Sequence, residues 1–185
     1  MPEPHTILFS GHLIDTELRQ PPRFPSSKAP AVGMAIEQAL QGILRSAGTS
    51  GVHGIAAAAC GGDIVFHETC RTLGIPSGIY LGIPVDAFLQ TSVAFAGQSW
   101  ITRYQQLIRD LPVHILLPNA TAAGDELWEK ANKWMLDTAL AETGTNTTLL
   151  TLWDGQTKKP GGPGQMIEMA RRQQVAISVI DILKL

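Results

Sequence analysis

A glycine-rich stretch in the last third of the chain has the residue types and spacing to bind an anion. Residues 160–168 read PGGPGQMIE and follow an apolar run at 147–153. Glycine lets the backbone approach a ligand closely, and the first free N–H groups of a helix attract negative charge. Gly161, Gly162 and Gly164 therefore predict a phosphate-binding loop, with Gln165 at the start of the helix after it. A plain flexible loop is the alternative.

A second glycine turn follows an earlier apolar run at 54–59. Cys60 stands before Gly61, Gly62 and Asp63, and a helical segment begins after them. Parallel strands end at one edge of a sheet, so right-handed connections bring this turn to the same edge as the first. We expect Gly61, Gly62 and Asp63 to join the ligand site. For Asp63, capping of the helix N-terminus is the alternative.

Polar residues also follow the first apolar run, at 6–10. Ser10, Gly11 and His12 stand at its carboxyl end, where ligands bind in open α/β sheets. The loop after them is long and rich in proline, and such loops are often functional when ordered. Four charged residues are further candidates for the ligand site. Asp15 and Arg23 belong to this loop, and Arg103 and Asp154 stand later in the chain. A solvated loop position is the alternative for His12, Asp15 and Arg23, and a surface position is the alternative for Arg103.

The segments that must position these residues alternate between two patterns. Short apolar runs lie at 6–10, 54–59, 77–83, 113–117, 147–153 and 175–180. Segments with helical spacing lie at 31–47, 64–73, 100–109, 126–141 and 166–173. The alternation predicts one α/β domain over residues 1–185 with a Rossmann-like, doubly wound parallel sheet of about six strands and helices on both faces. We expect the strand order 3-2-1-4-5-6.

Composition excludes several classes of protein. Hydrophobic residues make up 44% of the 185 residues and charged residues 16%, which is not the composition of a disordered chain. The net charge of −2 gives no reason to expect a nucleic acid or a membrane surface as partner. Cys60 and Cys70 have no metal-ligand spacing, so we expect a reduced, cytoplasmic protein without a metal or other cofactor.

The glycine stretch resembles a family signature. PGGPGQMIE is similar to the P-G-G-x-G-T-x-x-E motif of the Lonely Guy family, with Gln165 where the family has threonine. The wider group is the SLOG superfamily of Rossmann-like domains, and the opening at 10–15 with Arg23 looks like SLOG domains of bacterial signalling and defence proteins. The resemblance implies a nucleotide ligand and a homodimer, for which helix 126–141, with Trp128 and Trp134, is a candidate interface.

Two functions compete, because the family's enzymes resemble phosphoribohydrolases that cut the N-glycosidic bond of nucleoside monophosphates. In such an enzyme Glu168 would stabilise positive charge on the ribose, with Asp15, His12 or Asp154 as the second group and Arg103 as a further catalytic candidate. The hydrolases carry an arginine four residues before a methionine, where this chain has Ala131 before Met135. We therefore favour a nucleotide-binding module without turnover. A purely structural interaction domain is the third alternative.

Overall fold

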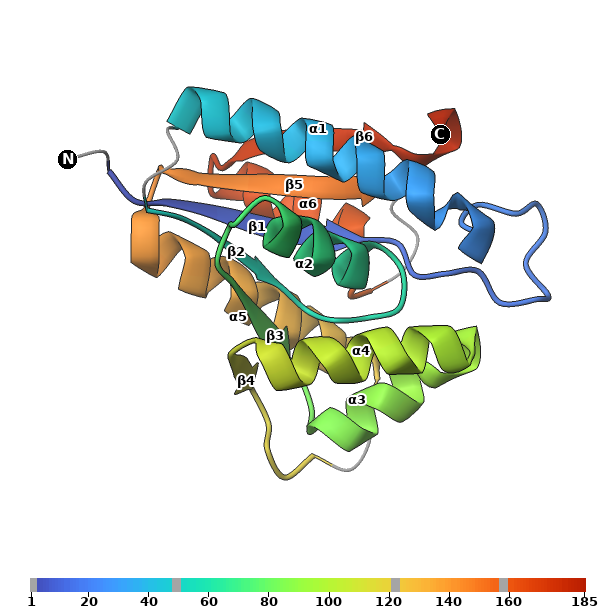
Figure 1. Cartoon of the computed structure of the whole chain (residues 1–185). Helices are drawn as coiled ribbons and strands as arrows, with labels where there is room; N and C mark the ends of the chain where they lie inside the picture. Colours follow the sequence, from blue (N-terminus) through green and yellow to red (C-terminus); the bar gives the residue numbers. More distant parts are fainter. Residues whose placement is uncertain (1–2, 48–50, 121–123, 157–159) are drawn as a thin grey trace.

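The six apolar runs form one parallel sheet in the computed structural model, which describes residues 3–47, 51–120, 124–156 and 160–185. The strands are β1 (His5–Gly11), β2 (Val52–Ala56), β3 (Ser77–Leu81), β4 (Val113–Ile115), β5 (Thr147–Trp153) and β6 (Ala176–Asp181). Figure 1 shows the sheet between two layers of helices. The predicted fold class, a doubly wound α/β sheet of six strands, is confirmed.

The predicted strand order is wrong at one position. The observed order is β4-β3-β2-β1-β5-β6, so β4 lies at the edge beside β3 rather than next to β1. The place beside β1 belongs to β5, which has seven residues and is buried along most of its length. β4 has three residues, none of them fully buried. The longer apolar strand thus takes the central position, and the short one takes the edge.

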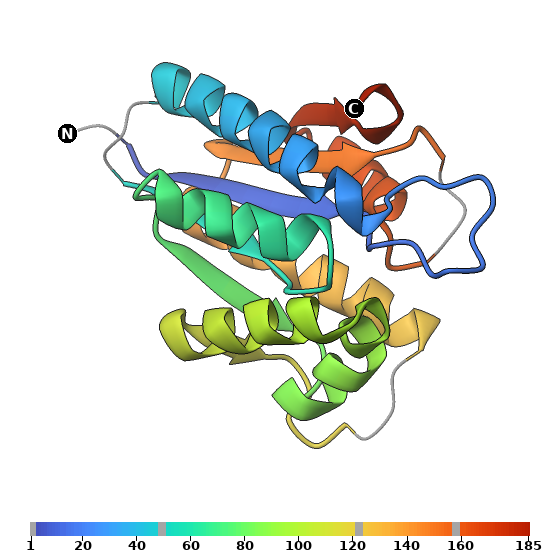
Figure 2. The same ribbon diagram turned by 45° about the vertical axis from the view of Figure 1, so that its right-hand side comes forward.

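Helices cover both faces of the sheet. α1 (Ala29–Ala47), α2 (Gly62–Thr72) and α4 (Gln98–Asp110) lie on one face, as Figure 2 shows. α5 (Asp125–Thr143) and α6 (Pro163–Arg172) cover the other. The short α3 (Val85–Ser92) follows β3. Alternation along β1 decides which side chain meets which layer: Ile7 and Phe9 face α1 and α2, and Leu8 faces α5 and α6.

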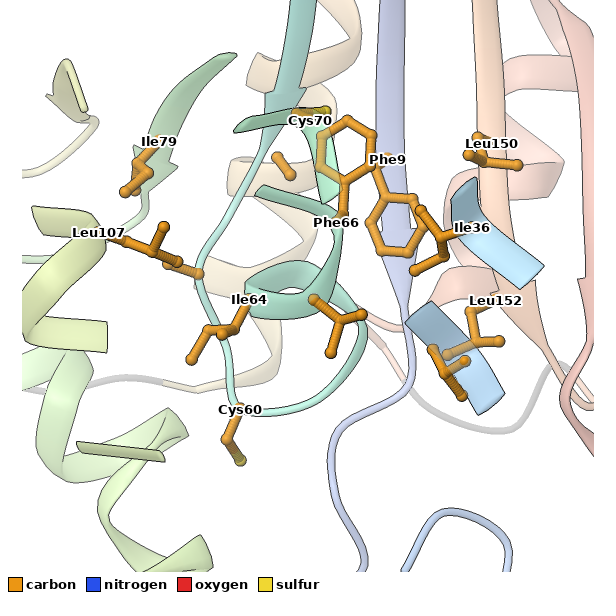
Figure 3. Close-up of a cluster of buried hydrophobic side chains, with 14 of the residues drawn as sticks. Phe9, Ile36, Cys60, Ile64, Phe66, Cys70, Ile79, Leu107, Leu150 and Leu152 are labelled. Atoms are coloured by element: carbon orange, nitrogen blue, oxygen red, sulfur yellow. The ribbon is translucent and has the colours of Figure 1, made fainter. Parts of the chain in front are cut away.

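An aromatic pair fills the core under the end of β1. The rings of Phe9 and Phe66 stack with centroids 4.7 Å apart, and Figure 3 shows them between β1 and α2. The two rings leave no space for a side chain at two neighbouring backbone positions. A β-carbon at Gly54 would lie 2.8 Å from the Phe66 ring, and one at Gly11 would lie 2.9 Å from the Phe9 ring. These two glycines are therefore required by packing.

The helices in the described part of the chain are all too short or too polar to cross a membrane.

Candidate functional site

A cleft of about 480 Å³ opens at the carboxyl edge of the sheet. It lies where β1 and β5 end and the chain leaves in opposite directions, which is the switch point where open α/β sheets bind ligands. The predicted residues from the first half of the chain that line it are Ser10, Gly11, His12, Asp15, Arg23 and Asp63. Those from the second half are Asp154, Gly161, Gly162 and Gly164. The cleft thus brings together candidates that stand far apart in the sequence.

Asp154 joins the two sides of the charged end of the cleft. Its Oδ2 accepts a hydrogen bond from Arg23 Nη1 at 3.2 Å, and its Oδ1 lies 3.1 Å from His12 Nε2. Burial alone would raise the pKa of Asp154, but the Gln156 N–H, His12 and Arg23 lower it instead. Burial, reinforced by Arg23, lowers the pKa of His12 to about 4. At neutral pH this corner therefore holds a neutral imidazole and an ionised carboxylate.

Asp15 organises the loop that carries the arginines. Its Oδ2 accepts hydrogen bonds from the backbone N–H groups of Arg23 and Phe24, each at 2.6 Å, and Phe24 is fully buried beneath the loop. Its Oδ1 lies 3.2 Å from Arg19 Nε. Asp15 thus holds the loop closed on itself. Arg19 also lines the cleft, although the sequence did not distinguish it from other loop residues.

The glycine loop before α6 approaches the cleft with its backbone. Gly162 is the N-cap and Pro163 the first residue of α6, which begins three residues earlier than predicted. Gly161 has a φ of 73°, and a β-carbon there would overlap Trp128 Cβ. Its N–H donates to Gln165 Oε1 at 2.9 Å. Gln165 does not line the cleft; it holds the glycine loop from within α6.

The second glycine turn has a packing role. Gly61, not Asp63, occupies the N-cap of α2, so the capping alternative for Asp63 is wrong. A β-carbon at Gly61 would lie 2.7 Å from the His12 carbonyl oxygen, and one at Gly62 would lie 3.0 Å from Gly11 Cα. Neither glycine lines the cleft. Their small size lets the end of β1 pass close to the start of α2.

Asp63 lies in the first turn of α2, where its carboxyl group faces the N-terminus of the helix. Its Oδ2 accepts a hydrogen bond from the Ala59 N–H at 3.3 Å. Burial raises the pKa of Asp63 to about 7. Because this carboxyl group already occupies the amino end of α2, the amino end of α6 is the better place for a ligand anion.

Two catalytic candidates lie away from the cleft. Arg103 Nε donates to Glu68 Oε1 at 2.8 Å, and its guanidinium lies 3.9 Å from the centre of the Trp100 ring. This pair joins α2 to α4 and lines a separate hollow. Glu168 is exposed on α6 and is not among the residues that line the cleft. Neither side chain is brought to the residues gathered around Asp154.

The apolar end of the cleft was not predicted. Phe88, Trp128 and Met135 line it, with the rings of Phe88 and Trp128 edge to face at 5.9 Å. Asn132 lines it too and is 5% exposed. The position of Asn132 beside the apolar stripe of its helix was the signal in the sequence that could have indicated this part of the cleft. Trp134 packs against Tyr80 at 5.1 Å, so both tryptophans of the predicted dimer interface have partners within the protein. The homodimer stays a prediction.

Among the described residues, no cluster of His, Cys, Asp or Glu side chains has the geometry to hold a metal ion.

The sheet order and the site at its carboxyl edge define a Rossmann-like α/β protein. Among solved structures, the chain is similar to DNA processing protein A (DprA) from Streptococcus pneumoniae, with a TM-score of 0.59 and 12% sequence identity. The match covers 96% of this chain and 50% of that chain, so this chain spans half the length of its structural neighbour. At this identity the likeness shows the fold alone. No protein-family model and no curated protein matches the sequence.

Proposed function

We propose that the cleft binds a nucleotide or a nucleotide-derived ligand and that the protein acts as a sensing module. The observation that carries this proposal is the glycine loop, since Gly162 and Gly164 at the start of α6 line the cleft with backbone alone. A phosphate there meets free N–H groups and the positive end of the helix. Arg19 and Arg23 lie in the same cleft, and its apolar end offers room for a base.

The position of Glu168 favours binding over hydrolysis. A carboxylate that stabilises charge on a ribose has to reach the sugar, and Glu168 is exposed outside the cleft. A Glu168→Gln variant is therefore expected to keep its affinity for nucleoside monophosphates. Incubation of the wild-type protein with AMP and CMP, followed by chromatography for released base, tests the hydrolase alternative directly. Release of base that Glu168→Gln abolishes would establish the enzyme instead.

Calorimetric titration with AMP and CMP tests binding itself. Gly162→Val places a branched side chain where the phosphate would approach the backbone, so binding is expected to be lost with little change in circular dichroism. Unchanged affinity in Gly162→Val would place the ligand elsewhere. The structural neighbour is a DNA-processing protein, so a short single-stranded oligonucleotide belongs in the same titrations. With a net charge of −2, we expect the mononucleotides to bind and the oligonucleotide not to bind.

A further inference from the structure

Two side-chain amides and one backbone N–H form a chain of hydrogen bonds between the glycine loop and the cleft. The Gly161 N–H donates to Gln165 Oε1 at 2.9 Å. A backbone N–H only donates, so the atom of Gln165 that faces it has to be the oxygen. The orientation of the Gln165 amide is thereby determined.

The same oxygen determines the orientation of Asn132. Asn132 Nδ2 lies 3.4 Å from Gln165 Oε1, in the position of a second donor to that oxygen. The reverse orientation would place two acceptor oxygens against each other. The amide nitrogen of Asn132 is therefore turned toward α6, and its oxygen, Oδ1, is left as the group available to a ligand.

Asn132 Oδ1 accepts no hydrogen bond from the described residues, although Asn132 is 5% exposed and lines the cleft. Oδ1 is not one of the fully buried side-chain atoms that lack a partner, so it is open to the cleft. A ligand N–H group that replaces water at this oxygen gains a direct hydrogen bond. Apolar and aromatic side chains line the same cleft, among them Phe88, Trp128, Ala131 and Met135. This end of the cleft suits a flat, uncharged ring with one hydrogen-bond donor on its edge.

We propose that Asn132 selects a ligand whose base carries an amino group, such as adenine or cytosine. The inference rests on the proposed function, because it assigns the base subsite of the same cleft. The amino N–H donates to Asn132 Oδ1, the ring lies against Trp128 and Phe88, and the phosphate lies at the start of α6. Gln165 is then a positioning residue, which connects the glycine loop to base selection.

The test compares AMP with purine riboside 5′-monophosphate, which differs from AMP only in lacking the exocyclic amino group. With the wild-type protein, calorimetry is expected to give up to roughly tenfold tighter binding of AMP, the effect of one additional hydrogen bond. Asn132→Leu keeps the size of the side chain and removes the acceptor, so the ratio of the two affinities is expected to fall to about one. The comparison of the two ligands on the wild-type protein does not depend on whether any variant folds.

Asn146→Leu is the matched control. Asn146 lies at the opposite edge of the sheet, just before β5, where its Nδ2 donates to Glu3 Oε2 at 2.7 Å. Its variant is expected to keep the preference for AMP. Equal binding of the two ligands by the wild type overturns the inference and leaves the proposed function standing, as does a preference that survives in Asn132→Leu. Failure of both ligands to bind overturns the proposed function and the inference together.

Discussion

Arg23 Nη1 donates to Asp154 Oδ2 across 3.2 Å, joining two residues that stand 131 positions apart. Arg23 belongs to the loop that follows β1, and Asp154 stands directly after β5. β1 and β5 are neighbours in the sheet, and the chain turns away from them in opposite directions. The ion pair therefore connects the segment after β1 to the segment after β5 across the switch point. It forms the charged wall of the cleft.

Arg23 is expected to matter for binding and Arg103 is not. Arg23→Gln removes a guanidinium from the cleft, so AMP affinity should fall by roughly tenfold, the effect of one charge-assisted hydrogen bond. Arg103→Gln breaks the pair with Glu68 between α2 and α4, outside the cleft. It should lower stability by about 1 kcal/mol or less, because the pair is partly exposed. Calorimetry on both variants checks this contrast; equal losses of affinity would contradict the placement of Arg103.

Gly161 in the glycine loop can be compared with a glycine of similar backbone conformation outside that loop. Gly161 and Gly155 have φ values of 73° and 80°, but a β-carbon at Gly155 would meet nothing within 4 Å. Gly155→Ala should cost roughly 1–2 kcal/mol, from the left-handed conformation alone. Gly161→Ala adds the clash with Trp128 and displaces the loop. We expect it to lose AMP binding and to unfold at a lower urea concentration than Gly155→Ala. Similar behaviour of the two variants would contradict this account of Gly161.

The buried carboxyl group of Asp63 should make the ligand-free protein less stable at pH 7 and above than at pH 4. Its pKa is raised from 3.8 to about 7 by burial, so its contribution to stability is fully present below about pH 4 and is lost as the pH rises through 7. Asp63→Asn lacks this ionisation. At pH 8 the variant should be more stable than the wild type, by up to about 1.4 kcal/mol for each unit of pKa shift. Urea unfolding at pH 5 and pH 8 measures the effect, and a difference that grows toward pH 5 would contradict it.

His67 should act in the opposite sense. Its Nδ1 lies 2.9 Å from Ser77 Oγ and its Nε2 lies 2.8 Å from the Ala57 carbonyl oxygen, and burial lowers its pKa to about 4. The unfolded chain takes up a proton near pH 6.5 and the folded chain does not, so stability falls as the pH drops from 6.5 toward 4. His67→Gln should cost about 1–3 kcal/mol at pH 7 through lost hydrogen bonds. It should also make the loss of stability between pH 6.5 and 4 shallower, and an unchanged slope would count against His67 as its source.

The fold followed from local patterns, and its one error came from a long-range choice. Apolar runs separated by helical segments specify parallel strands, because short connections and handedness leave few other arrangements. The position of β4 depended on how much apolar surface each strand buries against its neighbours. That quantity is set by helices on both faces, so the pattern of one strand does not reveal it.

The sequence predicted the parts of the site that the backbone forms. It predicted less well the parts that depend on contacts between side chains. Gly162, Gly164 and the polar residues at the end of β1 line the cleft because their position in a βαβ unit decides it. The two glycines before Asp63 gave the same signal, yet they serve close packing beneath His12. Asn132 went unrecognised because its role depends on Gln165, which is 33 positions away along the chain.

The crossing of α5 has a consequence for how the chain can be divided. This helix leaves the edge strand β4, contacts β3, β2 and β1 in passing, and delivers the chain to β5 on the far side. A break at Pro118 or Asn119 would separate two fragments, one holding β1–β4 and the other α5, β5 and β6. Each fragment would expose a strand edge and half of the cleft that only the other can cover. The two fragments should therefore associate to restore the sheet and the cleft. A ligand that binds only the complete cleft would stabilise this complex of fragments.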